Sequence, residues 1–155
     1  MDTDIYIRRI EESDVDELFT QMTALAENEG EQAHLTVTPA VLRQTGFRDA
    51  PSWSGFFALS GDKTAGYATY THDFHVWTGS PRITLDDIYV RPECRGLGFG
   101  ERLMSAVFDE AKKTGAYVNW TVRTDNKKAI AFYQRLGATY RVIGKCGWRA
   151  DAPGA

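Results

Sequence analysis

The chain has 155 residues, 43% of them hydrophobic and 25% charged, which is the size and composition of one ordinary globular domain. Its formal net charge of −3 argues against a general nucleic-acid surface, which needs clustered Lys and Arg. The two cysteines make no disulfide framework, and no apolar stretch is long enough to span a bilayer. Acidic residues open the chain where a secretory signal needs basic ones. We therefore expect a reduced, cytoplasmic protein without membrane or nucleic-acid partners.

The first part of the chain predicts one strand, two helices and a hairpin. After a short strand at residues 5–8, Ser13 is expected to cap a helix whose apolar residues recur at helical spacing up to Ala26. Thr38-Pro39 is expected to open a second helix that stops at Gly46. Gly61-Asp62 is then expected to join two strands of a hairpin, Phe56–Leu59 and Thr64–Thr71.

The remainder predicts alternating strands and helices. In chain order we expect a loop at 72–82, a strand at Ile83–Val90, a helix from Gly98 to Thr114, a strand at Tyr117–Val122, a helix at Asn126–Leu136 and short strands at Tyr140–Ile143 and Trp148–Arg149. This order predicts a mixed α/β fold with helices on the faces of one sheet. We expect a single domain over residues 1–150 and a frayed tail at 151–155.

A glycine-rich turn between a strand and a helix predicts an anion site. It reads Arg95-Gly96-Leu97-Gly98-Phe99-Gly100. The first amides of a helix lack intrahelical partners and carry the positive end of the macrodipole, so a pyrophosphate is favoured there. No Gly-Lys-Ser/Thr follows, and the spacing does not fit a dinucleotide fingerprint. By itself the turn is also compatible with a tight connection that binds nothing.

Two separated motifs resemble those of the GCN5-related N-acetyltransferase (GNAT) family. The segment from Val90 to Leu103 is similar to the family's acetyl-CoA motif, Arg/Gln-x-x-Gly-x-Gly/Ala after a strand. The segment from Asn126 to Ala138 is similar to the second signature, Asn-x-x-Ala-x-x-Phe-Tyr-x-x-x-Gly-Ala. The resemblance implies a GNAT fold, with a mostly antiparallel mixed sheet and helices on both faces, and acetyl-CoA as co-substrate.

The family resemblance also implies which residues hold acetyl-CoA. Strand backbone at Ile88, Tyr89 and Val90 would accompany the pantetheine arm, as an added strand does. The pyrophosphate would be held by the turn and the start of the helix after it, which comprise Arg95, Gly96, Leu97, Gly98, Phe99, Gly100 and Glu101. Asn126 and Ala129 would contact the pantetheine and phosphate region. Tyr133 would be the general acid that protonates the departing thiolate, although a helix aromatic at this position also suits a core.

A looser likeness to diamine (spermidine/spermine and thialysine) N-acetyltransferases points to the acceptor side. Leu25–Glu29, Leu85–Val90 and Gly147–Arg149 are similar to stretches of those enzymes. This resemblance places Asn28, Glu29, Asp86 and Asp87 near the acceptor, where the carboxylates of Glu29, Asp86 and Asp87 could recognise ammonium groups. It also implies a homodimer.

Direct attack by an amine on a thioester needs a proton acceptor. An alkylammonium has a pKa of about 10.4, so only about one molecule in 10³ is a free nucleophile at pH 7. We favour Asp86 as the base or as the holder of a water, with a solvated strand carboxylate as the alternative. Neighbouring strand residues point to opposite faces, so Asp86 and Asp87 share one face only if a bulge intervenes.

The sequence thus predicts direct acetyl transfer to a primary amine, with Tyr133 and Asp86 as catalytic residues. The expected acceptor is a small polyamine, diamine or lysine-like amino acid. The alternatives are a protein Lys or N-terminal amine, or a catalytically silent CoA-binding sensory module. No metal is expected, because His34, His72 and His75 have no ligand spacing with the cysteines.

Overall fold

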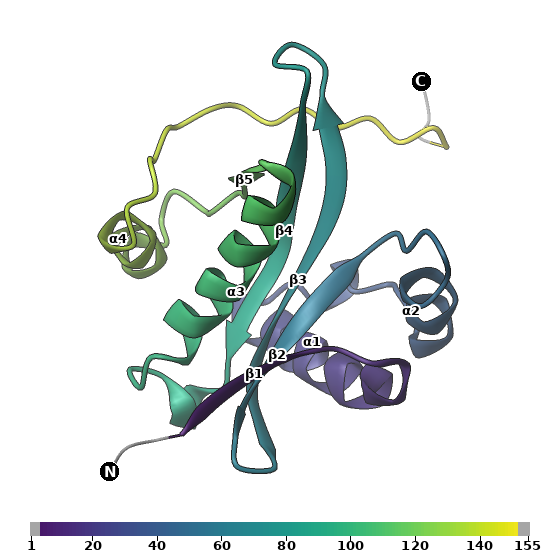
Figure 1. The fold of residues 1–155 in the computed structure, drawn as a ribbon, viewed down its shortest axis with the longest axis vertical. Coiled ribbons are helices and arrows are strands. Elements are labelled where there is room, and N and C mark those ends of the chain that lie inside the picture. The colour runs from purple at the N-terminus through teal and green to yellow at the C-terminus, as the bar shows by residue number, and fades with distance from the viewer. Residues whose placement is uncertain (1–3, 152–155) are drawn as a thin grey trace. The chain divides into compact units, whose positions relative to one another are not determined.

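A computed structural model describes residues 4–151 of the chain, which forms two compact units divided between Trp120 and Thr121. Figure 1 shows the course of the chain. The first unit contains five strands and three α-helices among its described residues, and the second contains one helix.

The first unit is built on one sheet whose strands follow the order of the chain, β1-β2-β3-β4-β5. The strands are β1 (Ile5–Arg9), β2 (Ser54–Ser60), β3 (Lys63–His75), β4 (Ser80–Val90) and β5 (Tyr117–Asn119). The first four are antiparallel, and β5 runs parallel to β4. A parallel neighbour requires a crossover, which the helix between β4 and β5 supplies.

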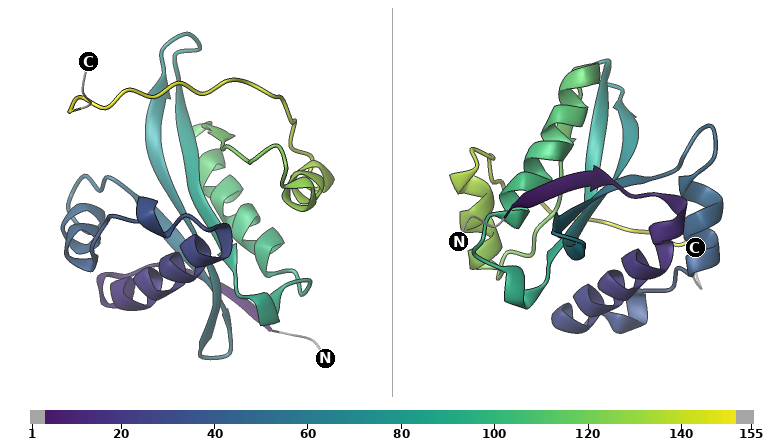
Figure 2. Two further views of the ribbon diagram at one scale, coloured as in Figure 1. Left: turned by 180° about the vertical axis from the view of Figure 1, so that it is seen from behind. Right: turned by 60° about the horizontal axis from the view of Figure 1, so that its bottom comes forward.

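Three α-helices cover the two faces of this sheet (Figure 2). Helices α1 (Val15–Glu29) and α2 (Pro39–Gly46) lie on one face, and α3 (Phe99–Thr114) lies on the other. Short 3₁₀ turns at 12–14, 32–34 and 92–94 join these elements. The predicted mixed α/β fold, mostly antiparallel and with helices on both faces, is confirmed.

The buried hydrophobic cluster beneath α1 includes two tyrosines. Tyr67 of β3 and Tyr89 of β4 are opposite each other in the strand register, so both point to this face. They pack with a buried cluster from β2, α1, α2 and the residue that follows β1, namely Ile10, Val15, Leu18, Leu42, Phe57 and Leu59. Packing therefore fixes the positions of both rings, including the ring that carries the Tyr67 hydroxyl.

Helix boundaries follow the local signals closely. Thr38 caps α2, since its hydroxyl accepts from the Val41 N–H, and Pro39 is the first helical residue, as expected. Gly98 and Gly115 bound α3, also as expected. The expected cap at Ser13 is wrong: Ser13 lies within the 3₁₀ turn, and Asp14 precedes α1 with its carboxylate bound to Arg8.

The strands differ more from their predicted extents. The loop expected at 72–82 is wrong, because β3 continues to His75 and β4 begins at Ser80, leaving only a tight turn. An ion pair supports this extension, as the Arg82 guanidinium binds Asp73 across the two strands. The strand expected at Tyr117–Val122 ends at Asn119.

The second unit contains α4 (Lys127–Arg135), as expected, followed by residues without regular structure up to a turn at 150–151. The strands expected at Tyr140–Ile143 and Trp148–Arg149 do not form. Residues 152–155 of the expected tail lie outside the described residues. No helix in the described part of the chain is both long and apolar enough to cross a membrane.

Candidate active site

Strand β4 leaves half of one edge open within the first unit. One of its edges pairs with β3 along nearly its whole length, while β5 pairs with the other only at Arg82, Ile83 and Thr84. The edge from Leu85 to Val90 has no strand partner among the five described strands. Its outward backbone groups are therefore suited to an extended ligand that adds to the sheet edge. The predicted pantetheine residues Ile88, Tyr89 and Val90 lie in this segment.

A β-bulge lies at the start of the open segment. In the register with β3, Thr69 is opposite Asp87 and Tyr70 is opposite Leu85, so Asp86 is the extra residue. A bulge lets two successive side chains depart from the strict alternation of a strand. This is the condition under which Asp86 and Asp87 can serve one site. Asp86 is exposed, whereas Asp87 is partly buried.

The environment of Asp87 disfavours its charged form. Burial raises the pKa of this carboxyl to about 6, and the negative charges of Asp86 and Glu29 act in the same direction. An ordinary Asp titrates near 3.9, so Asp87 changes protonation much closer to neutrality. A carboxyl with such a pKa is suited to accept a proton and release it again at physiological pH.

One partner of Asp87 is a residue that the sequence analysis did not select. The Tyr67 hydroxyl donates to Asp87 Oδ2 at 3.4 Å, and Tyr67 is fully buried. The strand pairing could have indicated this contact, since Tyr67 lies two residues before Thr69, the partner of Asp87. The pairing could not be worked out from the sequence, however, because the bulge shifts the register by one residue and no local sequence pattern reveals the bulge.

The C-terminal end of α1 brings further negative charge toward this region. Asn28 and Glu29 are exposed in its last turn, and Gly30 ends the helix with a left-handed φ of 70°. The C-terminus of a helix carries the negative end of its macrodipole. Glu29, Asp86 and Asp87 are thus electrostatically coupled across two elements, whereas no contact of the Asn28 side chain supports its expected role.

The glycine-rich turn predicted to hold an anion lies at the far end of the open strand, between β4 and α3. Gly96 and Gly98 have φ values of 76° and 90°, a conformation that residues with a Cβ rarely adopt. A Cβ on Gly96 would meet nothing within 4 Å, and one on Gly98 would meet only Ile5 Cδ1 at 3.6 Å. The space above both glycines is therefore open, so a bulky anion could approach the backbone here.

The first turn of α3 presents free backbone donors to this space. The Arg102 N–H bonds to the Gly98 carbonyl at 3.1 Å, so the preceding amides of Phe99, Gly100 and Glu101 have no acceptor within the helix. Gly98, at the N-cap position, has no side chain that could accept from these amides. The Phe99 side chain is buried and anchors the turn. These features fit a pyrophosphate group.

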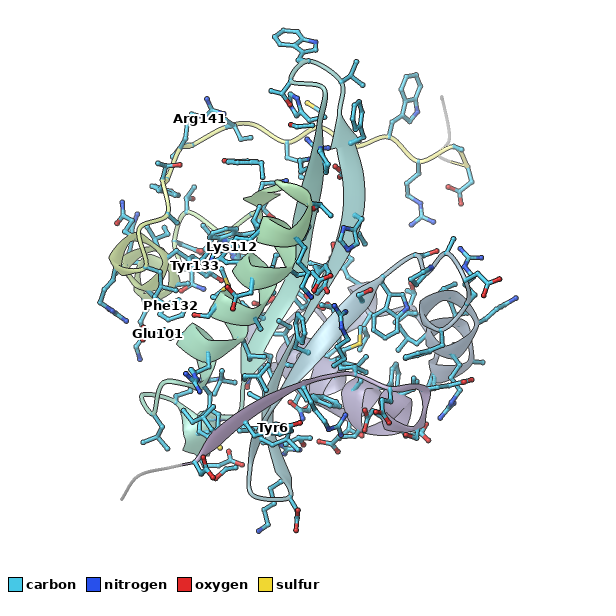
Figure 3. All side chains as sticks on the ribbon, in the orientation of Figure 1. Tyr6, Glu101, Lys112, Phe132, Tyr133 and Arg141 are labelled. Atoms are coloured by element: carbon cyan, nitrogen blue, oxygen red, sulfur yellow. The ribbon has the colours of Figure 1, made fainter. Side chains whose placement is uncertain are left out.

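The side chains beside this turn take different positions. The Arg95 Nε donates to the Val90 carbonyl at 3.0 Å, which ties the turn to the end of β4. Leu97 is exposed at the tip of the turn. Glu101 lies in the first turn of α3 (Figure 3), and its backbone amide is the group expected to hold phosphate.

The second unit holds the remaining predicted residues on and beside α4. The Asn126 side chain accepts from the Ala129 N–H at 3.1 Å and so caps the helix. Tyr133 is near the end of α4 beside Phe132, with ring centroids 5.3 Å apart (Figure 3). The expected roles of Asn126, Ala129 and Tyr133 toward acetyl-CoA remain predictions.

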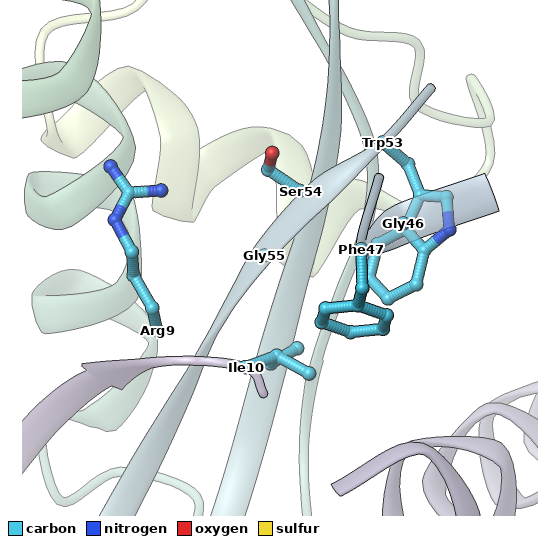
Figure 4. A pocket seen from close by; sticks show the side chains of 7 residues that line it. All are labelled: Arg9, Ile10, Gly46, Phe47, Trp53, Ser54 and Gly55. Carbon is cyan, nitrogen blue, oxygen red and sulfur yellow. The ribbon is translucent and has the colours of Figure 1, made fainter. Parts of the chain in front are cut away.

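A small open cavity of about 160 Å³ lies on the α2 side of the sheet edge (Figure 4). It is lined by Arg9, Ile10, Gly46, Phe47, Trp53, Ser54 and Gly55. The Trp53 ring packs edge-on against Phe47 and donates to the Thr45 hydroxyl. Of the aromatic residues exposed elsewhere, Phe74 and Trp77 extend into solvent around the β3–β4 turn. The described residues contain no cluster of His, Cys, Asp and Glu able to hold a metal ion.

An open strand edge beside a helix N-terminus with free amides, together with a carboxyl of raised pKa, is compatible with an acyltransferase site. The sequence profile of the acetyltransferase (GNAT) family matches residues 15–138, and the chain belongs to this family. It is accordingly an acetyltransferase.

Relatives over most of the chain are amine acetyltransferases. The thialysine N-epsilon-acetyltransferase of Sus scrofa is 31% identical over 148 residues, which cover 86% of this chain and 84% of the relative. The Bos taurus protein of the same name is 32% identical over 143 residues, covering 86% and 84%. A human spermidine/spermine N(1)-acetyltransferase-like protein 1 is 29% identical over 85% of this chain, but only 20% of that longer protein is covered.

Solved structures share the fold at lower identity. An aminoglycoside acetyltransferase from an uncultured soil metagenomic sample, in complex with sisomicin, superposes with a TM-score of 0.79 at 16% identity. The match covers 94% of this chain and 96% of that one. An integron cassette protein of V. cholerae gives a TM-score of 0.73 at 23% identity, covering 97% and 94%.

Proposed function

We propose that this acetyltransferase moves the acetyl group of acetyl-CoA directly to a primary amine of a small cationic acceptor, such as a polyamine, a diamine or a lysine-like amino acid. The observation that carries the proposal is that Glu29, Asp86 and Asp87 lie near enough to one another, beside the open edge of β4, for their negative charges to interact. Three carboxylates attract an ammonium group and suit a second positive charge on the same molecule. The thialysine acetyltransferase relatives support an acceptor of this class.

Acetyl-CoA would lie along β4 with its pyrophosphate on the α3 N-terminus, and it supplies the thioester carbonyl. Ile88, Tyr89 and Val90 would pair with the pantetheine arm, and the amides from Gly96 to Glu101 would hold the phosphates. Arg95, Leu97, Asn126 and Ala129 complete the proposed donor site. A backbone N–H of Ile88 or Tyr89 would meet the oxyanion as charge develops on the carbonyl oxygen.

Asp87 is a better candidate than Asp86 for the proton acceptor. Burial raises the pKa of both carboxyls, but Asp86 is the more exposed and suits the first contact with an ammonium group, whereas Asp87 is partly buried and its pKa is raised to about 6. The ammonium proton passes to the Asp87 carboxylate, and the freed nitrogen lone pair forms the C–N bond to the thioester carbonyl carbon. The C–S bond then breaks, and Tyr133 gives its proton to the departing thiolate. The nitrogen gives up its second proton as the amide forms, which replaces by way of solvent the proton that Tyr133 gave to the thiolate.

An acceptor panel with CoA-thiol release as the readout tests this function. With spermidine, putrescine and lysine, thiol release is expected to be faster than with a primary amine that has a neutral tail, and Asp86→Asn is expected to reduce that preference.

Tyr133→Phe is expected to lower kcat with little change in acetyl-CoA affinity. The acidic limb of the pH–rate profile is expected near pH 6, because Asp87 accepts a proton only when ionised.

Two other functions would give different results in the same assay. Thiol release with peptides bearing a Lys or an N-terminal amine, and none with small amines, would indicate a protein acetyltransferase. Tight binding of acetyl-CoA without thiol release from any amine would indicate a CoA-binding sensory module. A homodimer and a cytoplasmic location remain predictions, to be checked by sedimentation and by cell fractionation.

A further inference from the structure

Tyr67 donates a side-chain hydrogen bond to the proposed proton acceptor. It lies on β3 opposite Tyr89 and two residues from Thr69, which is opposite Asp87. Diagonal neighbours on one face of a sheet are within reach of a long aromatic side chain. The Tyr67 hydroxyl accordingly donates to Asp87 Oδ2 at 3.4 Å.

The ring that carries this hydroxyl has a fixed place. Tyr67 is fully buried within the apolar cluster beneath α1, beside Phe57 of β2 and Leu18 of α1. Burial also raises the pKa of Tyr67 far above neutrality, and the charges of Asp87 and Glu29 act in the same direction. The phenol therefore keeps its proton at every working pH and can only donate to a carboxylate.

The groups facing Asp87 have opposing effects on it. Burial, Asp86 on the same strand and Glu29 at the end of α1 all raise the pKa of Asp87, whereas the hydrogen bond from Tyr67 lowers it. Tyr89, also on β4, is another titratable group near Tyr67 and raises its pKa further. Without the donated hydrogen bond, burial and the two carboxylates would act on Asp87 unopposed.

We infer that Tyr67 is a positioning residue, whose hydroxyl holds the Asp87 carboxylate in one orientation and keeps it ionised for the incoming ammonium group. The inference rests on the proposed function, in which Asp87 accepts the proton of the amine. Tyr67 itself neither gains nor loses a proton during transfer. Its role is to keep the acceptor oxygen available at neutral pH.

Carboxyl ¹³C NMR titration of the intact chain tests this role without relying on activity. The Asp87 resonance is assigned by its loss in Asp87→Asn. In Tyr67→Phe we expect the midpoint of that resonance to move up by about one pH unit, since one hydrogen bond to a charged group has about that effect on a pKa. The acidic limb of kcat is expected to move with it, with little change in the acceptor KM.

Tyr70→Phe is a matched control. Tyr70 is also fully buried in β3, lies on the opposite face of the sheet, and has its hydroxyl 3.4 Å from Arg9 Nη1. It is expected to leave the Asp87 midpoint unchanged, and circular dichroism verifies that both variants are folded. The inference is overturned if Tyr67→Phe leaves the midpoint where it was, or if Tyr70→Phe moves it equally.

The proposed function can fail separately. If Asp87→Asn keeps the acidic limb and the rate of the unmodified enzyme, Asp87 is not the proton acceptor, whatever Tyr67 does to its titration. If Asp87→Asn removes the limb while Tyr67→Phe leaves both titration and limb in place, only the positioning role of Tyr67 is wrong.

Discussion

At the scale of single residues, Asp87 combines a functional advantage with a cost in stability. Its pKa of about 6 in the folded chain exceeds the value near 3.9 expected in the unfolded chain. The folded state therefore binds the proton more tightly. Its contribution to stability is fully present below about pH 4 and is lost as the pH rises through 6.

Asp87→Asn should consequently stabilise the fold at high pH. A shift of about two units corresponds to about 2.7 kcal/mol, which we reduce to about 1–2 kcal/mol because Asp87 is only partly buried. We expect the melting temperature at pH 8 to rise by about 3–6 °C, and the difference from the unmodified chain to disappear by pH 4. Calorimetry across this range measures it. A difference that is constant with pH would show that ionisation of Asp87 is not its source.

At the scale of elements, the N-terminus of α3 depends on Gly98 for both conformation and space. Gly98→Glu would place bulk and a negative charge over the free amides of the first turn. We expect it to weaken acetyl-CoA binding by at least about 100-fold, or about 2.7 kcal/mol, because the added carboxylate repels the phosphates and the side chain fills the space that they would occupy. Isothermal titration calorimetry with acetyl-CoA gives the affinity directly.

Gly115→Glu is the matched control at the other end of the same helix. Gly115 has a similar left-handed φ of 67°, and a Cβ at this position would meet nothing within 4 Å. The variant should lose about 1 kcal/mol of stability through backbone strain, as Gly98→Glu also should, but keep its affinity for acetyl-CoA. Equal affinity losses in the two variants would indicate helix damage and argue against the predicted anion site.

The elements also show where sequence reasoning succeeds. Helices α2 and α3 were predictable at their ends, because Thr38, Pro39, Gly98 and Gly115 act through contacts within one turn. The glycine-rich turn before α3 was predictable for the same reason, whereas its binding of a pyrophosphate remains a prediction. The end of the β3–β4 hairpin was not, because His72–His75 and Ser80–Arg82 gain strand structure from each other across the turn.

The acceptor side was predictable only in part. The sequence selected Asp86 and Asp87 and indicated that a bulge would be needed for both to serve one site. It could not reveal the bulge or the contact with Tyr67, because both are properties of the register between two strands. The strands expected after α4 likewise depended on pairing with distant segments, which residue pattern alone does not determine.

At the scale of the whole molecule, the overall charge acts in the same direction as the proposed acceptor site. The formal net charge of −3 and the carboxylates beside β4 both favour cationic acceptors. We expect kcat/KM for spermidine to fall several-fold between about 0.05 M and 0.5 M ionic strength, because the Debye length shortens to a few ångströms. A monoamine should lose less. Equal salt dependence for the two acceptors would argue against charge recognition.

The open half of β4 has a consequence for the protein as a solute. A strand edge with unpaired amides and carbonyls is a template on which another chain can add, and natural proteins protect such edges with charges and bulges. Here the bulge and the carboxyls of Asp86 and Asp87 lie at the start of the segment without a strand partner. The same features proposed to receive an amine would therefore also discourage the edges of two molecules from joining into aggregates.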